Sequence, residues 1–369
     1  MNRHNAQKSL LNGIEPLHVE AGDALRLSHI SRAFDGVQAL KDVSLNVTSG
    51  EIICLVGHSG CGKTSLLRII AGIDAPDSGT LMIGGKMLVG PSVFVEPEKR
   101  DVGVVFQDYA LFPHLTVAQN VKFGLRAFKS ADANHRVAEL LQRVSLGDKA
   151  DRYPHQLSGG EQQRVALIRA LAPKPHVLLM DEPFSNLDRG LRASVRRETI
   201  SLLRQLGTTA IIVTHEAEEA LSTGDRVVLM RSGEIVQTGS AREIYQHPVN
   251  RYAAEFFCDF NVIPGRFGQD GVETPLGVFK ANKTDMSSGQ ALVYLRPDDL
   301  HIVPDDAVTL GDIRGKVVSR SYFGQGEELI LKVEGLENTL RIHTKMQIPH
   351  GVTHIFLRIS AENALIFAD

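Results

Sequence analysis

The feature that most limits the possible folds is a glycine-rich octapeptide, GHSGCGKT, at residues 57–64. It fits the spacing G-x-x-x-x-G-K-S/T and lies between a short apolar segment, EIICLVG, and a segment with helical spacing, GKTSLLRIIAGI. In such a loop, backbone N–H groups surround phosphates at a helix N-terminus, Lys63 reaches the β and γ phosphates, and Thr64 offers its hydroxyl to Mg²⁺. The sequence therefore predicts a nucleoside triphosphate site in a strand–loop–helix unit.

Strand and helix patterns alternate from Leu25 to about residue 259, which predicts a doubly wound, largely parallel α/β domain over 25–259. A stretch rich in helix formers, at about 111–157, is expected to be a helical insert. Beyond about Phe260, short strand patterns such as ALVYLRP and EELILKV are separated by Gly, Pro and Asp. We predict a separate small all-β barrel of OB-like type over 260–369, and a flexible tail over 1–24.

Composition restricts the partners and the compartment. The formal net charge is −3, and acidic residues outnumber basic ones after Phe260, which argues against nucleic acid as a partner. Cys54, Cys61 and Cys258 form an odd, widely spaced set, which indicates free thiols in a reducing compartment. No apolar run approaches the roughly 20 residues of a membrane span, and the first residues do not read as a secretory signal. A role at a membrane would therefore be that of a peripheral subunit.

Two carboxylates follow the apolar run VLLM. Asp181 and Glu182 are expected at the carboxyl edge of the sheet, beside the phosphate loop. Asp181 is suited to hold Mg²⁺ through water, and Glu182 to orient and deprotonate an attacking water. The alternative is a solvated acid pair that ends a strand. The presence of a phosphate loop in the same chain argues against this alternative.

A second glycine pair opens another predicted helix, in LSGGEQQR at residues 157–164. Ser158 is a good N-cap, and Gly159 and Gly160 leave backbone N–H groups open, so the segment can bind an anion. One nucleotide does not need two such sites from one chain. The alternative is an ordinary capped helix.

Together these elements resemble the ABC transporter ATPases, in that family's order, over about residues 25–258. The resemblance implies an ATPase that uses ATP and Mg²⁺, with a Walker A loop at 57–64, a signature at 157–161 and a Walker B strand that ends in Asp181 and Glu182. Gln107, after DVGVVF, is similar to the Q-loop residue that touches Mg²⁺ and the permease. Ser185–Asp188 resembles the D-loop, and His215 the switch histidine that senses the γ phosphate.

Phe34 falls where the family places an aromatic residue that stacks on adenine, and a core phenylalanine is the alternative. His58 and Glu161 depart from the commonest family residues, which are proline or serine in the loop and glutamine in the signature. The resemblance thus implies a catalytic set of Lys63, Glu182 and His215, and a metal set of Thr64, Gln107 and Asp181. The implied nucleotide-binding set is Phe34, Gly57, His58, Ser59, Gly60, Cys61, Gly62, Lys63, Thr64, Ser65, Gln107, Ser158, Gly159, Gly160, Glu161 and Asp188.

Three further stretches resemble parts of importer ATPases. YALFPHLTVAQNVKFGL, from Tyr109, resembles the region that docks a permease, although it could also be core of the helical insert. RPDDL at 296–300 and GKVVSRSYFGQGEEL at 315–329 resemble a TOBE domain. VFVEPEKRDVGVVFQDYALFPHLTV is most similar to ferric-iron importer ATPases, with polyamine, sulfate or thiosulfate, and molybdate systems as alternatives.

The resemblance implies a homodimer at the cytoplasmic face of the inner membrane. Its partners would be integral-membrane permease subunits and, indirectly, a substrate-binding protein. The alternative class is a non-transport ABC ATPase, which usually carries two cassettes in one chain, whereas one set of motifs is present here.

Overall fold

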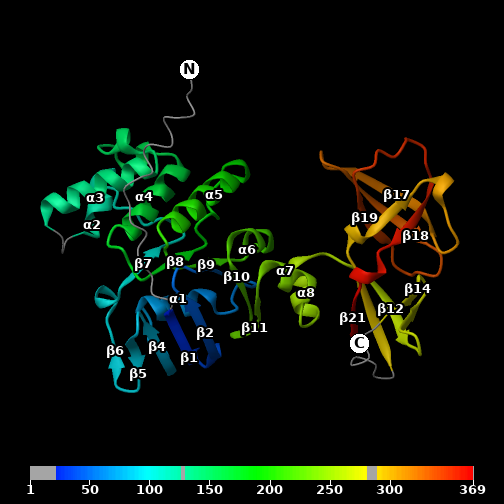
Figure 1. The fold of residues 1–369 in the computed structure, drawn as a ribbon, viewed down its shortest axis with the longest axis horizontal. Helices are drawn as coiled ribbons and strands as arrows, with labels where there is room; N and C mark the ends of the chain where they lie inside the picture. The colour runs from blue at the N-terminus through cyan, green and yellow to red at the C-terminus, as the bar shows by residue number, and fades with distance from the viewer. Residues whose placement is uncertain (1–21, 126–128, 281–288, 369) are drawn as a thin grey trace. The chain divides into compact units, whose positions relative to one another are not determined.

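The computed structural model describes residues 22–125, 129–280 and 289–368 (Figure 1). The chain divides into two compact units, with the division between Ile244 and Tyr245. The tail predicted at 1–24 lies mostly outside the described residues, and the first strand already begins at Asp23.

A six-stranded sheet forms the centre of the first unit, in the order β11-β10-β3-β9-β8-β7. The pairs from β10 through β3, β9 and β8 to β7 are parallel, and β11 is antiparallel to β10. Every residue of β3 and β9 is buried, which explains their unbroken apolar sequences. The strands are β3 Ile52–Val56, β7 Val102–Val105, β8 Val177–Asp181, β9 Ala210–Thr214, β10 Arg226–Arg231 and β11 Glu234–Gly239.

A second sheet of this unit is wholly antiparallel, in the order β2-β1-β4-β5-β6. Its buried apolar residues share one core with helix α1 and the central sheet. The alternating patterns near residues 25–47 predicted strands, but the sequence did not reveal that they form a sheet of their own. The strands are β1 Asp23–Phe34, β2 Val37–Thr48, β4 Ser78–Ile83, β5 Lys86–Gly90 and β6 Val93–Phe94.

Helices follow the strands of the central sheet, as the doubly wound prediction requires. Within the predicted insert, α2 begins at a capping box formed by Thr116 and Gln119, and the buried Asn120 amide donates to the carbonyls of Phe112 and Leu115. The helices of this unit are α1 Lys63–Ala71, α2 Val117–Phe123, α3 Ser130–Arg143, α4 Gly159–Leu171, α5 Arg189–Gln205 and α6 Ala217–Thr223. Helix α7, Ala241–Gln246, contains the point of division.

The second unit consists of helix α8, Arg251–Phe257, and two five-stranded antiparallel sheets around one apolar core. This confirms the predicted all-β unit, and its two sheets are consistent with an OB-like (TOBE-like) fold. One sheet holds β12 Asn261–Phe267, β13 Val272–Thr274, β14 Gly277–Phe279, β15 Gln290–Leu295 and β21 Leu365–Ala368. The other holds β16 Leu300–Val303, β17 Ile313–Tyr322, β18 Glu327–Val333, β19 Leu340–Thr344 and β20 His354–Ile359.

Contacts inside the second unit explain why it begins before residue 260. The Tyr294 hydroxyl donates to Glu255 at 2.7 Å, and the Arg296 guanidinium lies 4.5 Å from the centre of the Tyr245 ring. These contacts join α8 and the end of α7 to the strands. The boundary between functional domains at 259 and 260 stays a prediction.

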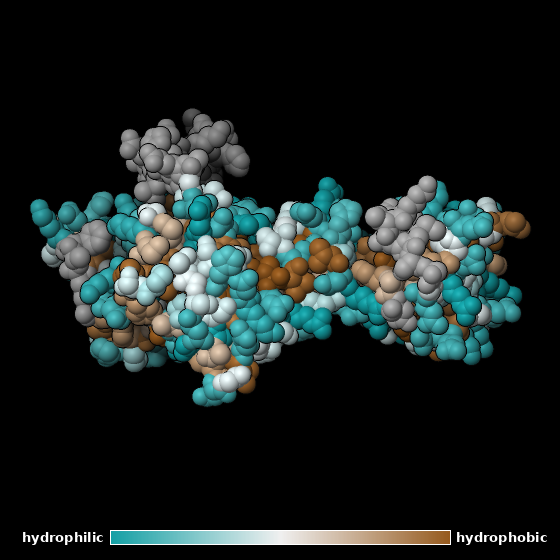
Figure 2. Space-filling model, turned by 90° about the horizontal axis from the view of Figure 1, so that it is seen from below, coloured by the Kyte–Doolittle hydropathy of each residue, from teal (hydrophilic) through white to brown (hydrophobic). Residues whose placement is uncertain are grey.

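The molecular surface is mainly hydrophilic in the view of Figure 2, with separate hydrophobic areas. Among the residues that the structure describes, none of the helices is both long and apolar enough to cross a bilayer.

Candidate active site

The loop between β3 and α1 has a backbone that only glycine accommodates at two positions. A Cβ atom on Gly57 would lie 2.4 Å from the carbonyl oxygen of Met230, and one on Gly62 would lie 2.4 Å from that of Ala39. Gly62 also has a φ of +105°, in the left-handed region. The loop is therefore compact, and it leads directly into the N-terminus of α1, where phosphate groups are favoured.

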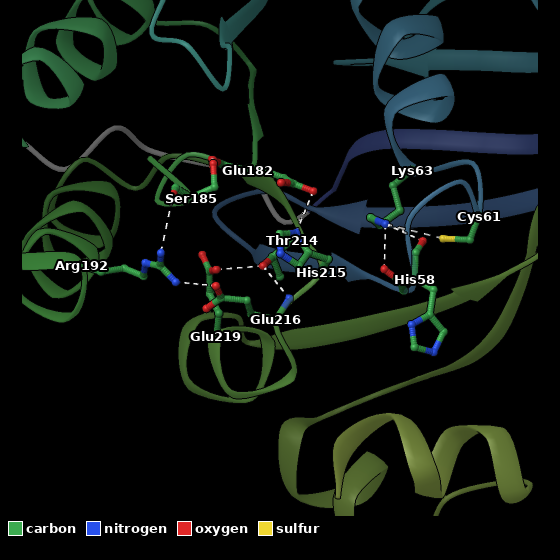
Figure 3. A network of polar contacts seen from close by, with 11 residues as sticks. His58, Cys61, Lys63, Glu182, Ser185, Arg192, Thr214, His215, Glu216 and Glu219 are labelled. Carbon is green, nitrogen blue, oxygen red and sulfur yellow. Dashed lines mark hydrogen bonds and ion pairs between the residues drawn. The ribbon is translucent and has the colours of Figure 1, made fainter. Parts of the chain in front are cut away.

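The Lys63 side chain folds back over this loop. Its ammonium donates to the carbonyl oxygens of Gly57 at 2.7 Å and His58 at 3.0 Å (Figure 3). The side chain is buried, with 5% of its surface exposed. A buried ammonium held by two carbonyls can instead contact phosphate oxygens that enter the loop. The His58 imidazole points away from Lys63 in Figure 3.

Asp181 ends β8 beside the start of α1. The Thr64 hydroxyl lies near its carboxylate. Burial, followed by the charge of Glu182, raises the pKa of Asp181. The Lys63 charge and the Thr64 hydroxyl oppose this shift and help to lower the pKa. The site thus brings together a hydroxyl and a carboxylate oxygen, the ligand types that Mg²⁺ prefers. These residues fit a magnesium-bound triphosphate.

Glu182 and His215 follow adjacent parallel strands, β8 and β9, and their side chains meet. His215 Nδ1 lies 2.9 Å from Glu182 Oε1. The backbone of Glu182 has a φ of +44°, unusual for a residue with a side chain, and its N–H donates to the Val213 carbonyl at 3.0 Å. This conformation turns the carboxylate toward the edge where the phosphate loop lies (Figure 3).

Gln107, two residues beyond β7, is held through its backbone. The Asn186 amide donates to the Gln107 carbonyl at 2.8 Å. Just after it, Tyr109 and Ala110 have φ values of +62° and +43°. Arg169 of helix α4 donates to both of their carbonyls, at 3.0 and 2.7 Å. Arg169 and the contact of the D-loop residue Asn186 with Gln107 could not be predicted from the sequence, because these contacts join segments about 60 to 80 residues apart.

The signature segment opens α4 as predicted. Ser158 and Glu161 form a capping box, in which Glu161 accepts from the Ser158 N–H at 2.9 Å. Lys149 forms an ion pair with Glu161, and this contact is the main reason that the pKa of Glu161 is lowered. Glu161, which stands where glutamine is commoner, is therefore paired with a cation 12 residues earlier in the chain.

Phe34 and Asp188 lie at element ends. Phe34, at the end of β1, is 38% exposed, so it is not a core residue, and the Arg32 guanidinium lies 4.7 Å from its ring centre. Asp188 caps α5 by accepting from the Leu191 N–H at 3.0 Å. The nucleotide-contacting roles given to Phe34, Asp188 and the signature residues stay predictions.

The central, largely parallel sheet and the site at its carboxyl edge define a phosphate-loop ATPase cassette. Residues 40–185 match the family model described as ABC transporter. The chain is 45% identical, over 85% of each chain, to the sulfate/thiosulfate import ATP-binding protein CysA 2 of Chromobacterium violaceum. It is 43% identical to the spermidine/putrescine protein PotA of Marinobacter nauticus over 84% of each chain. It is 42% identical to the Fe(3+) protein FbpC of Pseudomonas fluorescens, over 85% of this chain and 88% of that one.

Two solved structures agree with these relatives. The chain is similar to cbiO1 of Clostridium perfringens, part of the ABC transporter complex cbiONQ, with a TM-score of 0.56 and 30% identity over 60% of this chain and 90% of that one. It is also similar to a dimeric, post-hydrolysis ATP-binding cassette bound to ADP and phosphate, with a TM-score of 0.51 and 31% identity over 59% and 99%. The chain belongs to the ABC transporter family, among its import ATP-binding subunits. It is an ATPase that binds ATP with Mg²⁺.

Proposed function

We propose that this chain drives solute import by hydrolysing ATP at the edge formed by β3, β8 and β9. The observation that carries the proposal is the Glu182–His215 pair, 2.9 Å apart, beside the loop that holds Lys63. Glu182 is the general base, because its carboxylate can accept the proton of a water that attacks the γ phosphorus. The bond between that phosphorus and the bridging oxygen then breaks, which releases ADP and phosphate.

The remaining side chains of the site bind the triphosphate and orient the groups that react. Lys63 and the loop N–H groups contact the β and γ phosphates, while Thr64, Asp181 and Gln107 would hold Mg²⁺. When bound, Mg²⁺ offsets the negative charge of the triphosphate. His215 keeps the Glu182 carboxylate in place, and in this proposal it also senses the γ phosphate.

A homodimer accounts for the second anion site. The relative bound to ADP and phosphate is a dimer, which supports a two-fold arrangement for this chain. The open N–H groups at Gly159 and Gly160, at the start of α4, would contact the γ phosphate of the partner subunit. Closure of the dimer would move paired permease subunits at the cytoplasmic face of the membrane, and a substrate-binding protein would deliver the solute.

The candidate solutes are ferric iron, polyamines, sulfate or thiosulfate, and molybdate. Our hypothesis from the sequence is that the solute is ferric iron. Relatives named for sulfate or thiosulfate, for spermidine and putrescine, and for Fe(3+) are 45%, 43% and 42% identical to this chain. These values are too similar to separate the substrates. Uptake of labelled ferric iron, spermidine and sulfate by a deletion strain would decide. Loss of iron uptake alone supports iron, whereas loss of another solute with iron uptake intact overturns it.

The catalytic proposal is tested with Glu182→Gln. The amide can still hold water but cannot take its proton, so ATP binding should persist while turnover falls by about 100-fold or more. The variant should accumulate as an ATP-bound dimer in size-exclusion chromatography with Mg²⁺. Wild-type turnover in this variant would remove Glu182 from the mechanism.

A further inference from the structure

Arg192, in the first turn of α5, contacts two loops at once (Figure 3). One of its terminal nitrogens, Nη1, forms an ion pair with Glu216. The other, Nη2, donates to the backbone carbonyls of Ser185 at 3.3 Å and Leu187 at 3.1 Å. The side chain is only 25% exposed. A guanidinium is the one side-chain group whose planar set of donors can serve three such acceptors.

The first of these loops begins at Glu182. The Ser185 N–H and hydroxyl both donate to the Glu182 carbonyl, at 3.2 and 2.9 Å, so the loop winds tightly around that residue. Arg192 contacts the far end of the same loop, at Ser185 and Leu187. A displacement of this end of the loop would therefore also move the backbone of Glu182.

The second loop carries His215, which directly precedes Glu216. The Glu216 N–H donates to the Thr214 hydroxyl at 3.1 Å, and that hydroxyl donates to the buried carboxylate of Glu219 at 2.8 Å. The backbone is thus fixed on both sides of His215. The ion pair with Arg192 joins this fixed segment to the loop that holds Glu182.

We propose that Arg192 is a positioning residue for ATP hydrolysis. Its guanidinium holds the loop 182–188 against the loop 214–216 and so keeps the Glu182 and His215 side chains paired. It acts through the backbone and Glu216, and not by contact with the reacting atoms. The inference rests on the roles proposed above for Glu182 and His215.

Four variants test this role. Arg192→Ala should lower kcat by about tenfold to a hundredfold, because a shift of about 1 Å in a catalytic group has effects of this size. The KM and the dissociation constant for ATP should stay within about twofold, since the phosphate loop is untouched. Added guanidinium ion should restore part of the lost kcat.

Arg192→Lys should have a kcat between those of wild type and Arg192→Ala, because it keeps the charge opposite Glu216 but loses the planar fork. Glu216→Gln should lower kcat less than Glu216→Ala, because its amide oxygen can still accept from Arg192.

Arg204→Ala is the matched control. Arg204 lies on the same helix and pairs with Asp225 at 3.2 Å, but its side chain is 59% exposed. This variant should keep wild-type kcat and should not respond to guanidinium. Wild type and Glu182→Gln are measured in the same assay, so an inactive wild type would count against the proposed function and not against Arg192.

Several results would overturn the inference. They are wild-type kcat in Arg192→Ala, an equal loss in Arg204→Ala, and a loss of ATP affinity that parallels the loss of kcat. If Arg192→Ala does not fold, a folded Arg192→Lys protein with wild-type kcat and no change in its pH profile would overturn it as well.

Discussion

Three residues of the proposed ATP site have strained backbone conformations. Glu182, Tyr109 and Ala110 all have positive φ values, which cost about 1–3 kcal/mol each for residues with a side chain. Specific hydrogen bonds offset this cost: the Val213 carbonyl accepts from Glu182, and Arg169 donates to Tyr109 and Ala110. The site is thus built as much by backbone conformation as by the identity of its side chains.

Phe34 offers a direct test at this scale. If adenine stacks on its ring, Phe34→Ala should weaken ATP binding by about 1–3 kcal/mol, and Phe34→Tyr should bind normally, because it keeps the aromatic face. Met87→Ala removes another exposed apolar side chain of the same sheet and should have no effect. Titration with a fluorescent ATP analogue provides the measurement. Equal affinity in the Ala variant and wild type would refute stacking.

At the scale of helices and strands, side-chain contacts in the short connections determine where each element begins and ends. The capping box that opens α4 is joined to the 3-10 turn Gly147–Lys149 by the ion pair between Lys149 and Glu161. In the second unit, Arg358 on β20 donates to both carboxylate oxygens of Asp312, just before β17, at 2.9 and 2.8 Å. Such paired contacts fix where one element ends and the next begins.

The Asp312–Arg358 pair predicts a dependence on pH. The Arg358 guanidinium, helped by the Thr309 N–H, holds the pKa of Asp312 well below its ordinary value of 3.8. A lowered pKa means that the stabilisation is complete above that ordinary value and is lost as the pH falls through the folded-state value. Asp312→Asn should therefore reduce stability at pH 6 but lose less stability on acidification below about pH 4.

Urea unfolding of the full chain between pH 6 and pH 3 measures this difference. Asp306→Asn, which changes an exposed carboxylate in the same loop, serves as the control. A wild type and an Asp312→Asn variant with parallel pH profiles would contradict the prediction.

At the scale of the whole molecule, the proposed homodimer makes each ATP site depend on two chains. Lys63→Ala damages the loop that binds phosphate, and Gly159→Asp places a carboxylate where the partner's γ phosphate should lie. Each variant alone should be nearly inactive. In a mixed dimer both lesions fall in one site, which leaves the other site intact.

Random mixing gives about half mixed dimers, so recovered ATPase activity should reach at most roughly a quarter of wild type if the sites work independently. A covalently linked pair of subunits separates coupling between sites from failure to assemble. If neither the mixture, with proven subunit exchange, nor the linked dimer recovers activity, the shared-site arrangement is wrong or its sites cannot work singly.

The sequence by itself determined the class of fold and the chemistry. Local patterns suffice for this: a glycine-rich loop before a helix needs glycine, lysine and threonine at fixed spacing, and Asp181 and Glu182 follow a strand whose apolar run marks it as buried. The all-β unit after residue 260 could also be predicted from local patterns, because apolar alternation and turn residues repeat every few positions there.

Only the tertiary structure decided which distant residues meet. The 2.9 Å contact between Glu182 and His215 depends on β8 and β9 being neighbours, and the contacts of Arg169 and Arg192 depend on how α4 and α5 lie against loops far away in the chain. An arginine on a helix looks alike in sequence whether it faces water or two carbonyls. Its surroundings are set by packing between elements, which no local pattern encodes.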